Sequence, residues 1–375
     1  MLIQYLFLIL LIVLIIVFAE FIRRKGFDNL KIYREVENNK VIEGETFKIT
    51  MVLENNKRLP LFFLAISEQI PFGLQYATEV TAYMEGKDIW HVSKYSIKWY
   101  ERRKRTYTLV GAARGTYLIK NMNITVGDIF GLSANSKEQE DYIEVIVYPK
   151  IHGINKYEFD ITSFQGEDAV RRWIHKDPLF IKGIREYNVE DRMKDIHWKS
   201  SLKMNKLMVK DYDYTSEREL VIILNVQCGD PHWSNIQKEA IEAGIRIAAS
   251  LGAKAIKEGM PTGMWTNAQL ITYDTTVANE IKPTMGSFKA IMEMCARADI
   301  ATKWDFNEYL QKRAQSFNSN CTYVIVTPYL NEKDINVISK LRRSGHKIKI
   351  IDVSLKSSVP AIDGIEKIIY KGGIV

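Results

Sequence analysis

A dense group of charged and aromatic residues between positions 183 and 201 is the part of this sequence best equipped for chemistry. Asp191 and Asp195 lie shortly before His197. A histidine oriented by a carboxylate is a common general base, so one hypothesis makes the chain a hydrolase of unknown substrate that uses these three residues.

The alternative is a structural cluster. In this interpretation Arg185 and Arg192 pair with the acids, and Trp198 packs below them. No nucleophile or metal-ligand spacing accompanies the acid and base, so the structural interpretation is favoured. No catalytic residue, cofactor or small-molecule substrate is predicted.

An α/β domain is predicted over residues 215–375, after the cluster. Residues 220–224 form a continuous apolar run, typical of a strand buried on both faces, and runs at 323–326 and 348–353 are similar. Helix starts are expected at a Ser234–Gln237 capping box, at an Asp305–Glu308 box and at Asn331. No glycine-rich nucleotide motif follows the first strand.

A β-sandwich is predicted before the cluster, over residues 28–150. Phe47, Ile49, Met51 and Leu53 alternate with polar residues, which indicates a half-buried strand. Similar runs separated by turn signals predict seven or eight short strands, a pattern typical of an immunoglobulin-like sandwich. Residues 151–214 then form a connector that carries the charged cluster.

An apolar segment at residues 2–22 predicts a single transmembrane helix within an anchor of residues 1–25. A signal peptide is the alternative, but no small-residue cleavage site follows. Arg23, Arg24 and Lys25 come directly after the segment. Because cations flanking a membrane helix stay on the cytoplasmic side, the soluble domains are expected in the cytoplasm of a single-pass membrane protein.

The net charge of +7 does not indicate nucleic-acid binding, because Lys and Arg are spread along the chain and are matched by acids in most segments. We interpret the excess as partly a topology signal and partly attraction to an anionic membrane surface. A mixture of aromatic and basic residues at 90–107 is interpreted as a strand end beside the membrane. Cys228, Cys295 and Cys321 lack disulfide or zinc spacing and are expected to be small buried thiols.

The central cluster resembles the domain of unknown function 58 family. The matching residues are Arg185, Glu186, Tyr187, Asp191, Arg192, Asp195, Ile196, His197 and Trp198. Upstream, residues 114–117, 128–132 and 147–149 look like further motifs of this family, with Ile129 in place of the usual proline.

The resemblance implies membrane helices, often a pair, then a sandwich and a von Willebrand A-like domain. It also implies an association with MoxR-type AAA+ ATPases and no established catalysis. Magnesium-binding von Willebrand A domains use a carboxylate and two hydroxyls after the first strand, whereas this chain has Asn225, Gln227 and Gly229 there. We therefore expect a degenerate site without metal.

These observations together predict a membrane-anchored, non-enzymatic scaffold or regulatory protein. Its α/β face would dock a protein partner, possibly a MoxR-type ATPase. Metal-dependent adhesion outside the cell conflicts with both the flanking charges and the missing ligands.

Overall fold

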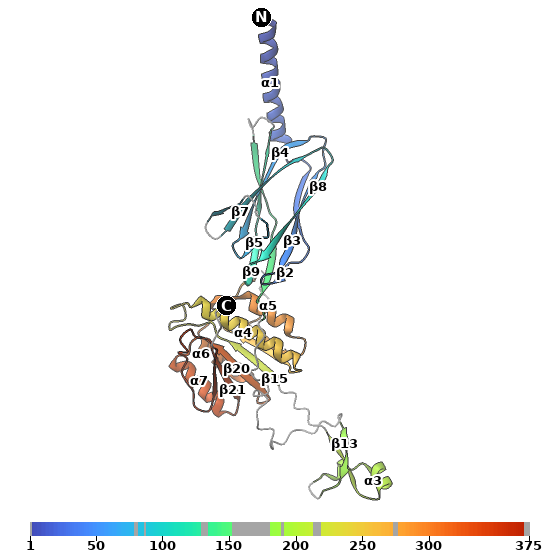
Figure 1. Cartoon of the computed structure of the whole chain (residues 1–375), viewed down its shortest axis with the longest axis vertical. Coiled ribbons are helices and arrows are strands. Elements are labelled where there is room, and N and C mark those ends of the chain that lie inside the picture. The colour runs from blue at the N-terminus through green and yellow to red at the C-terminus, as the bar shows by residue number, and fades with distance from the viewer. Residues whose placement is uncertain are drawn as a thin grey trace.

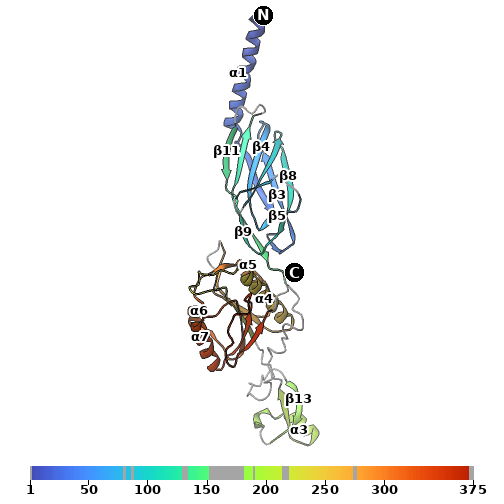
Figure 2. The same cartoon turned by 60° about the vertical axis from the view of Figure 1, so that its left-hand side comes forward.

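The computed structural model describes residues 2–78, 82–85, 88–128, 134–151, 181–188, 191–212, 219–272 and 277–370. An apolar helix, a β-sandwich and an α/β domain follow one another along the long axis (Figures 1 and 2). Residues 129–132 of the predicted motif at 128–132 lie outside the described residues.

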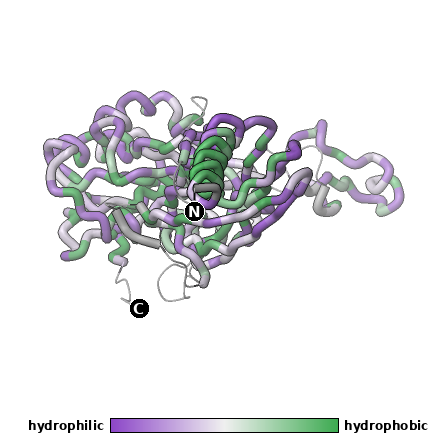
Figure 3. The backbone as a smooth tube through the Cα atoms, turned by 90° about the horizontal axis from the view of Figure 1, so that it is seen from above, coloured by the Kyte–Doolittle hydropathy of each residue, from purple (hydrophilic) through white to green (hydrophobic). Residues whose placement is uncertain are grey.

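The first helix, α1 (Leu2–Lys25), is apolar along nearly all of its length and exposes most of its side chains (Figure 3). Its segment Gln4–Lys25 is long and apolar enough to cross a membrane, although a signal sequence shares these properties. Only its last turns contact the sandwich, where Ala19 and Ile22 are buried. Ile22 belongs to the same core cluster as Ile32 and Val126, so the helix packs directly against the domain below it.

Two antiparallel sheets pack face to face to form the sandwich. One contains, in order, β1 (Leu30–Val36), β3 (Thr46–Asn55), β8 (Arg102–Gly111) and β5 (Leu74–Tyr76). The other contains β11 (Ala134–Gln139), β10 (Met122–Gly127), β4 (Leu61–Pro71), β7 (Asp88–Ile97) and β6 (Ala82–Glu85). A small third sheet joins β2 (Lys40–Ile42), β12 (Ile143–Tyr148) and β9 (Gly115–Ile119) at the end nearer the α/β domain.

The alternation predicted for residues 47–53 is confirmed, because Phe47, Ile49, Met51 and Leu53 are all buried in β3. The described region has more strands than the seven or eight expected. Several are very short, such as β2 and β5 with 3 residues each, and such strands show little periodicity.

The α/β domain is built on a six-stranded sheet. Its order is β18 (Glu280–Thr284), β16 (Thr262–Thr266), β15 (Glu219–Leu224), β20 (Cys321–Thr327), β21 (Lys347–Asp352) and β22 (Glu366–Ile369), and only the β18 edge is antiparallel. Helices α4 (Lys238–Lys257) and α5 (Phe288–Arg297) cover one face. Helices α6 (Phe306–Arg313) and α7 (Glu332–Arg343) cover the other. A short pair, β17 (Ala268–Leu270) and β19 (Ala298–Thr302), lies beside it.

The charged cluster folds into a small unit of its own. Strands β13 (Ile181–Glu186) and β14 (Met208–Tyr212) are antiparallel and enclose a short 3-10 turn, η1 (Met193–Asp195), and the helix α3 (Trp198–Met204). We call this unit the motif hairpin. It projects below the α/β domain in Figure 1.

One of the three expected helix starts is wrong, and a second is confirmed without its capping bond. Helix α4 begins at Lys238 without a side-chain cap, because the Ser234 hydroxyl donates to the carbonyl of Pro231 instead. Helix α6 follows Asp305, which also makes no capping bond. The start at Asn331 is confirmed, since Asn331 and Asp334 form a reciprocal capping box. All three cysteines are buried and free, as expected.

Candidate functional site

The motif hairpin uses its arginine and aspartate to close its own loop. Arg185 donates from Nη1 and Nη2 to the two carboxylate oxygens of Asp191, at 2.7 and 2.5 Å. Asp191 also accepts from the backbone N–H of Asn188 at 2.9 Å. A forked arginine–carboxylate pair of this kind fixes geometry as well as charge. Asp191 therefore pairs with Arg185 and holds the turn after β13.

His197 is built into the backbone of the same unit. It occupies the N-cap position of α3, where its Nδ1 accepts from the N–H of Ser200 at 3.2 Å. Its own N–H donates to the carbonyl of Met208, and the Ser201 hydroxyl accepts from the N–H of Met208 at 2.9 Å. These bonds tie α3 to β14.

Two expectations for the cluster are wrong. Trp198 is 63% exposed and does not pack below the ion pairs. Arg192 is exposed and forms no ion pair with any described residue. The other motif residues have local roles: Glu186 pairs with Lys206 on the surface, and the N–H of Tyr187 donates to the carbonyl of Leu207. Asp195 is buried in η1.

The motif hairpin instead presents an exposed apolar surface. Trp198 and Leu202 lie four residues apart on α3 and so share one helix face, with Leu202 84% exposed. We call the exposed apolar side chains in the described part of this unit the hairpin surface; they are Ile184, Met193, Trp198, Leu202, Met204 and Leu207. Exposed lysines surround it at positions 194, 199 and 203.

The predicted degenerate metal site lies at the carboxyl end of β15 and is filled by amides. Asn225 Oδ1 accepts from the N–H of Gln227 at 2.9 Å and from Asn267 Nδ2 at 2.8 Å. Asn225 Nδ2 donates to Thr327 Oγ1 at 2.9 Å, and Gln227 Oε1 accepts from the N–H of Phe306 at 2.9 Å. The oxygens at these positions thus bond within the protein. The prediction of no metal remains a prediction.

A group of acids lies next to this amide network. His232 Nδ1 and Asp305 Oδ1 are 3.0 Å apart, and Asp230 lies near Asn331. Asp334 is fully buried and accepts from the N–H of Asn331 at 2.9 Å. Burial raises the pKa of Asp334 from 3.8 to about 6, despite that bond, and the charges of Asp305 and Asp230 act in the same direction. The sequence offered only one signal for this residue, its place in the capping box.

A third polar region joins the sandwich to the α/β domain, and the sequence did not predict it. Arg114 donates to both carboxylate oxygens of Glu242 on α4, at 2.8 and 2.5 Å. Its Nη1 also donates to the carbonyls of Cys295 and Ala298, both at 2.8 Å. These carbonyls lie at the C-terminus of α5, where backbone acceptors lack helical partners. Arg114 therefore acts as a cap supplied from the other domain.

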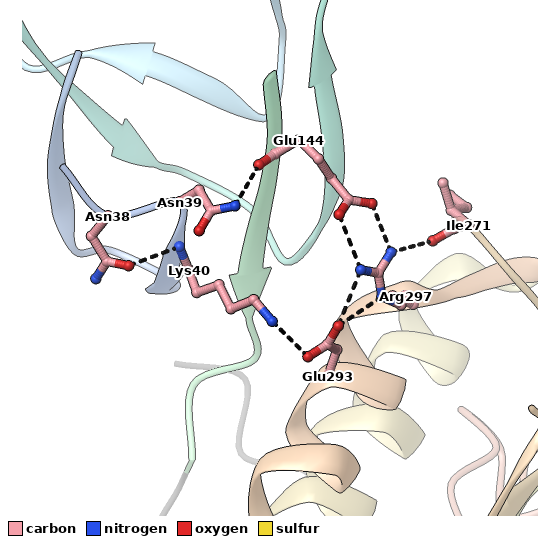
Figure 4. A network of polar contacts seen from close by, with 7 residues as sticks. All are labelled: Asn38, Asn39, Lys40, Glu144, Ile271, Glu293 and Arg297. Carbon is pink, nitrogen blue, oxygen red and sulfur yellow. Dashed lines mark hydrogen bonds and ion pairs between the residues drawn. The ribbon is translucent and has the colours of Figure 1, made fainter. Parts of the chain in front are cut away.

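A second set of bonds continues this joint (Figure 4). Arg297, at the end of α5, donates to Glu144 of β12 at 2.7 Å and to Glu293 of its own helix at 3.1 Å. Lys40 of β2 donates to Glu293 at 2.8 Å. At a further point Arg246 pairs with Glu43 at 3.0 Å. The two domains thus meet through several ion pairs, with α5 at the centre.

A family model and a curated protein each match part of this chain. Residues 183–360 match the model described as "Protein of unknown function DUF58". The Uncharacterized protein YeaD of Bacillus subtilis (strain 168) is 20% identical over 235 residues, which cover 62% of this chain and 54% of YeaD. The matched region is thus about half of that relative's length.

The matching solved structures have low identity and low TM-scores. A CARDB domain from Pyrococcus furiosus, described in complex with di-metal ions, is 13% identical with a TM-score of 0.23, covering 32% of this chain and 94% of that domain. A non-cellulosomal cohesin from Archaeoglobus fulgidus is 12% identical with a TM-score of 0.23, covering 37% of this chain and 99% of the cohesin. The family match covers the motif hairpin from Gly183 onward and the α/β sheet through β21.

Proposed function

We propose that this protein is a membrane-anchored, non-enzymatic scaffold that docks a protein partner. In this proposal α1 is an uncleaved anchor, and the soluble domains lie in the cytoplasm because Arg23, Arg24 and Lys25 follow the apolar segment. The α/β domain is taken as von Willebrand A-like. A MoxR-type AAA+ ATPase is the candidate partner, on the strength of the family resemblance.

The hairpin surface is the observation that carries the proposal. An apolar group of this kind, rimmed by polar residues, is typical of a protein interaction site. Tryptophan and methionine are enriched at the centres of such sites, and Trp198 and Met193 are both well exposed here. The exposed lysines around them favour a partner with an acidic rim.

The polar residues of the motif hairpin support docking over hydrolysis. The hydrolase hypothesis makes His197 a general base that a nearby aspartate orients. Both carboxylate oxygens of Asp191 accept hydrogen bonds from Arg185, and His197 Nδ1 accepts one from the backbone N–H of Ser200. Both residues therefore hold the shape of the unit that presents Trp198.

The test is capture of a purified MoxR-type AAA+ ATPase by the full-length chain in nanodiscs. Trp198→Ala should abolish capture, because it removes the largest side chain of the hairpin surface. Trp233→Ala is the matched control, since Trp233 is 70% exposed but lies after β15 at the carboxyl edge of the sheet.

Loss of capture with Trp233→Ala alone would move the docking site to the sheet edge. Capture of the ATPase by neither the wild type nor any variant would refute the partner. Hydrolysis of an ester or phosphoester substrate that disappears in His197→Ala, at an unchanged melting temperature, would refute the non-enzymatic role.

A further inference from the structure

The end of the sandwich from which α1 emerges carries a distinctive set of side chains. Strand pairing brings residues far apart in the sequence to this end: Leu30 lies opposite Asn55, and Leu61 lies opposite Ile97. The turns after β3 and after β7 therefore lie beside the base of the helix. Lys57 Nζ donates to the carbonyl of Gly26 at 2.8 Å, which ties the first of these turns to the end of α1.

Large aromatic side chains are exposed at this end. Trp99 is 62% exposed, and Tyr100, Phe62 and Phe63 are exposed as well. Trp99 and Tyr100 form the turn between β7 and β8, and the two phenylalanines begin β4. We call these four residues the aromatic rim.

Cations accompany the aromatic rim. Residues 20–30, 56–63 and 97–101 contain six Lys or Arg residues and three acids. Arg58 and Lys98 are exposed and form no ion pair with a described residue. Arg23 and Arg24 pair with Glu20 on the last turns of α1.

The end of α1 packs on the sandwich and so holds the aromatic rim at a fixed position relative to the helix. Ile22 is buried in the sandwich core, and a side chain at Gly26 would meet the Ile22 carbonyl and Val126 at 2.7 Å. The chain thus turns tightly from helix to sandwich, with no spacer between them. If α1 spans a bilayer, its terminal cations lie among the headgroups and the aromatic rim lies level with them.

We propose that this end of the sandwich docks on a bilayer surface rich in anionic lipid. The aromatic rim lies in the interfacial layer, where tryptophan and tyrosine are favoured, and Arg58 and Lys98 contact headgroup phosphates. The inference rests on the membrane anchorage in the proposed function and adds a second contact between protein and lipid. It also accounts for the aromatic and basic mixture near residue 100 without nucleic acid.

The test uses the full-length chain in nanodiscs whose lipids carry bromine near the top of the acyl chains. Bromine quenches tryptophan only on contact, so the bromine-dependent loss of emission should disappear in Trp99→Phe. It should persist in Trp233→Phe, the matched control at the carboxyl edge of the α/β sheet. A double variant, Arg58→Gln with Lys98→Gln, should reduce quenching in phosphatidylglycerol discs and leave it unchanged in phosphatidylcholine discs.

Three results would overturn the proposal in separable ways. Equal quenching in the wild type and Trp99→Phe, with all chains co-eluting with discs, rejects the docking and leaves the anchorage intact. Equal quenching of the double variant and the wild type in phosphatidylglycerol rejects the role of the two cations. A wild-type chain that does not co-elute with the discs rejects anchorage and docking together.

Discussion

Replacing Arg114 by methionine should loosen the joint between the sandwich and the α/β domain. Its guanidinium donates to Glu242 and to carbonyls at the end of α5, and its side chain is only 5% exposed. Methionine keeps most of the volume but supplies no donor. The variant would leave the Glu242 carboxylate without its partner and the α5 carbonyls without a cap.

The expected loss of unfolding free energy follows from these contacts. Removing one partner of a buried ion pair costs about 3–5 kcal/mol. Glu242 is 20% exposed in its side chain, so water partly replaces the arginine and favours the lower part of that range. The uncapped carbonyls add about 1–3 kcal/mol if they remain dry. We expect a total of about 4 kcal/mol, and about half of that for Arg114→Lys, which keeps the charge but loses the fork.

Urea unfolding of the full-length chain, followed by tryptophan emission, measures this loss. With a slope of about 2 kcal/mol per molar urea, the first transition should move down by about 2 M in Arg114→Met. Arg102→Met is the control, because Arg102 also pairs with acids but its side chain is 53% exposed. Its midpoint should equal that of the wild type. A midpoint for Arg114→Met that also equals the wild-type value would refute the joint described here.

Three further outcomes are expected from single substitutions. Asp334→Asn should leave the free energy of unfolding little changed near pH 4 and raise it by about 2–3 kcal/mol near pH 8. The reason is that the folded-state pKa of Asp334, about 6, exceeds the ordinary 3.8, so the wild type loses stability as the pH rises from the lower value through the higher one. A difference in unfolding free energy that does not depend on pH would contradict this. Asn225→Asp should lose the hydrogen-bond donors to Thr327 and Tyr329 and destabilise the α/β domain by about 3 kcal/mol. If Mg²⁺ restored the melting temperature of this variant, the new carboxylate would have completed a metal site. His197→Ala should weaken the start of α3 by about 1 kcal/mol, seen as roughly fivefold faster hydrogen exchange at Ser200, and an unchanged rate would remove the capping role.

Features determined by neighbouring residues could be predicted from the sequence. The apolar run of α1, the alternation in β3 and the continuous apolar strand β15 each depend on a local pattern, and all three are present. The capping box at Asn331 is local too. The same signature failed at Ser234, because its hydroxyl bonds to Pro231 in the turn after β15 and the helix starts later.

Features that depend on distant contacts could not be predicted. Arg114 and Glu242 are 128 positions apart in the sequence, so no local pattern joins them. Trp198 was expected to pack below the ion pairs of the cluster, but it is 63% exposed. The motif hairpin has only two strands and one helix of 7 residues, which offer too little interior to cover an indole.

The burial of Ile22 in the sandwich core has a mechanical consequence. Because α1, the sandwich and the α/β domain are joined by packed contacts and ion pairs, force is transmitted from one end of the molecule to the other without a flexible linker. If α1 spans a bilayer, as proposed above, a sideways force on the α/β domain would tilt α1 in that bilayer.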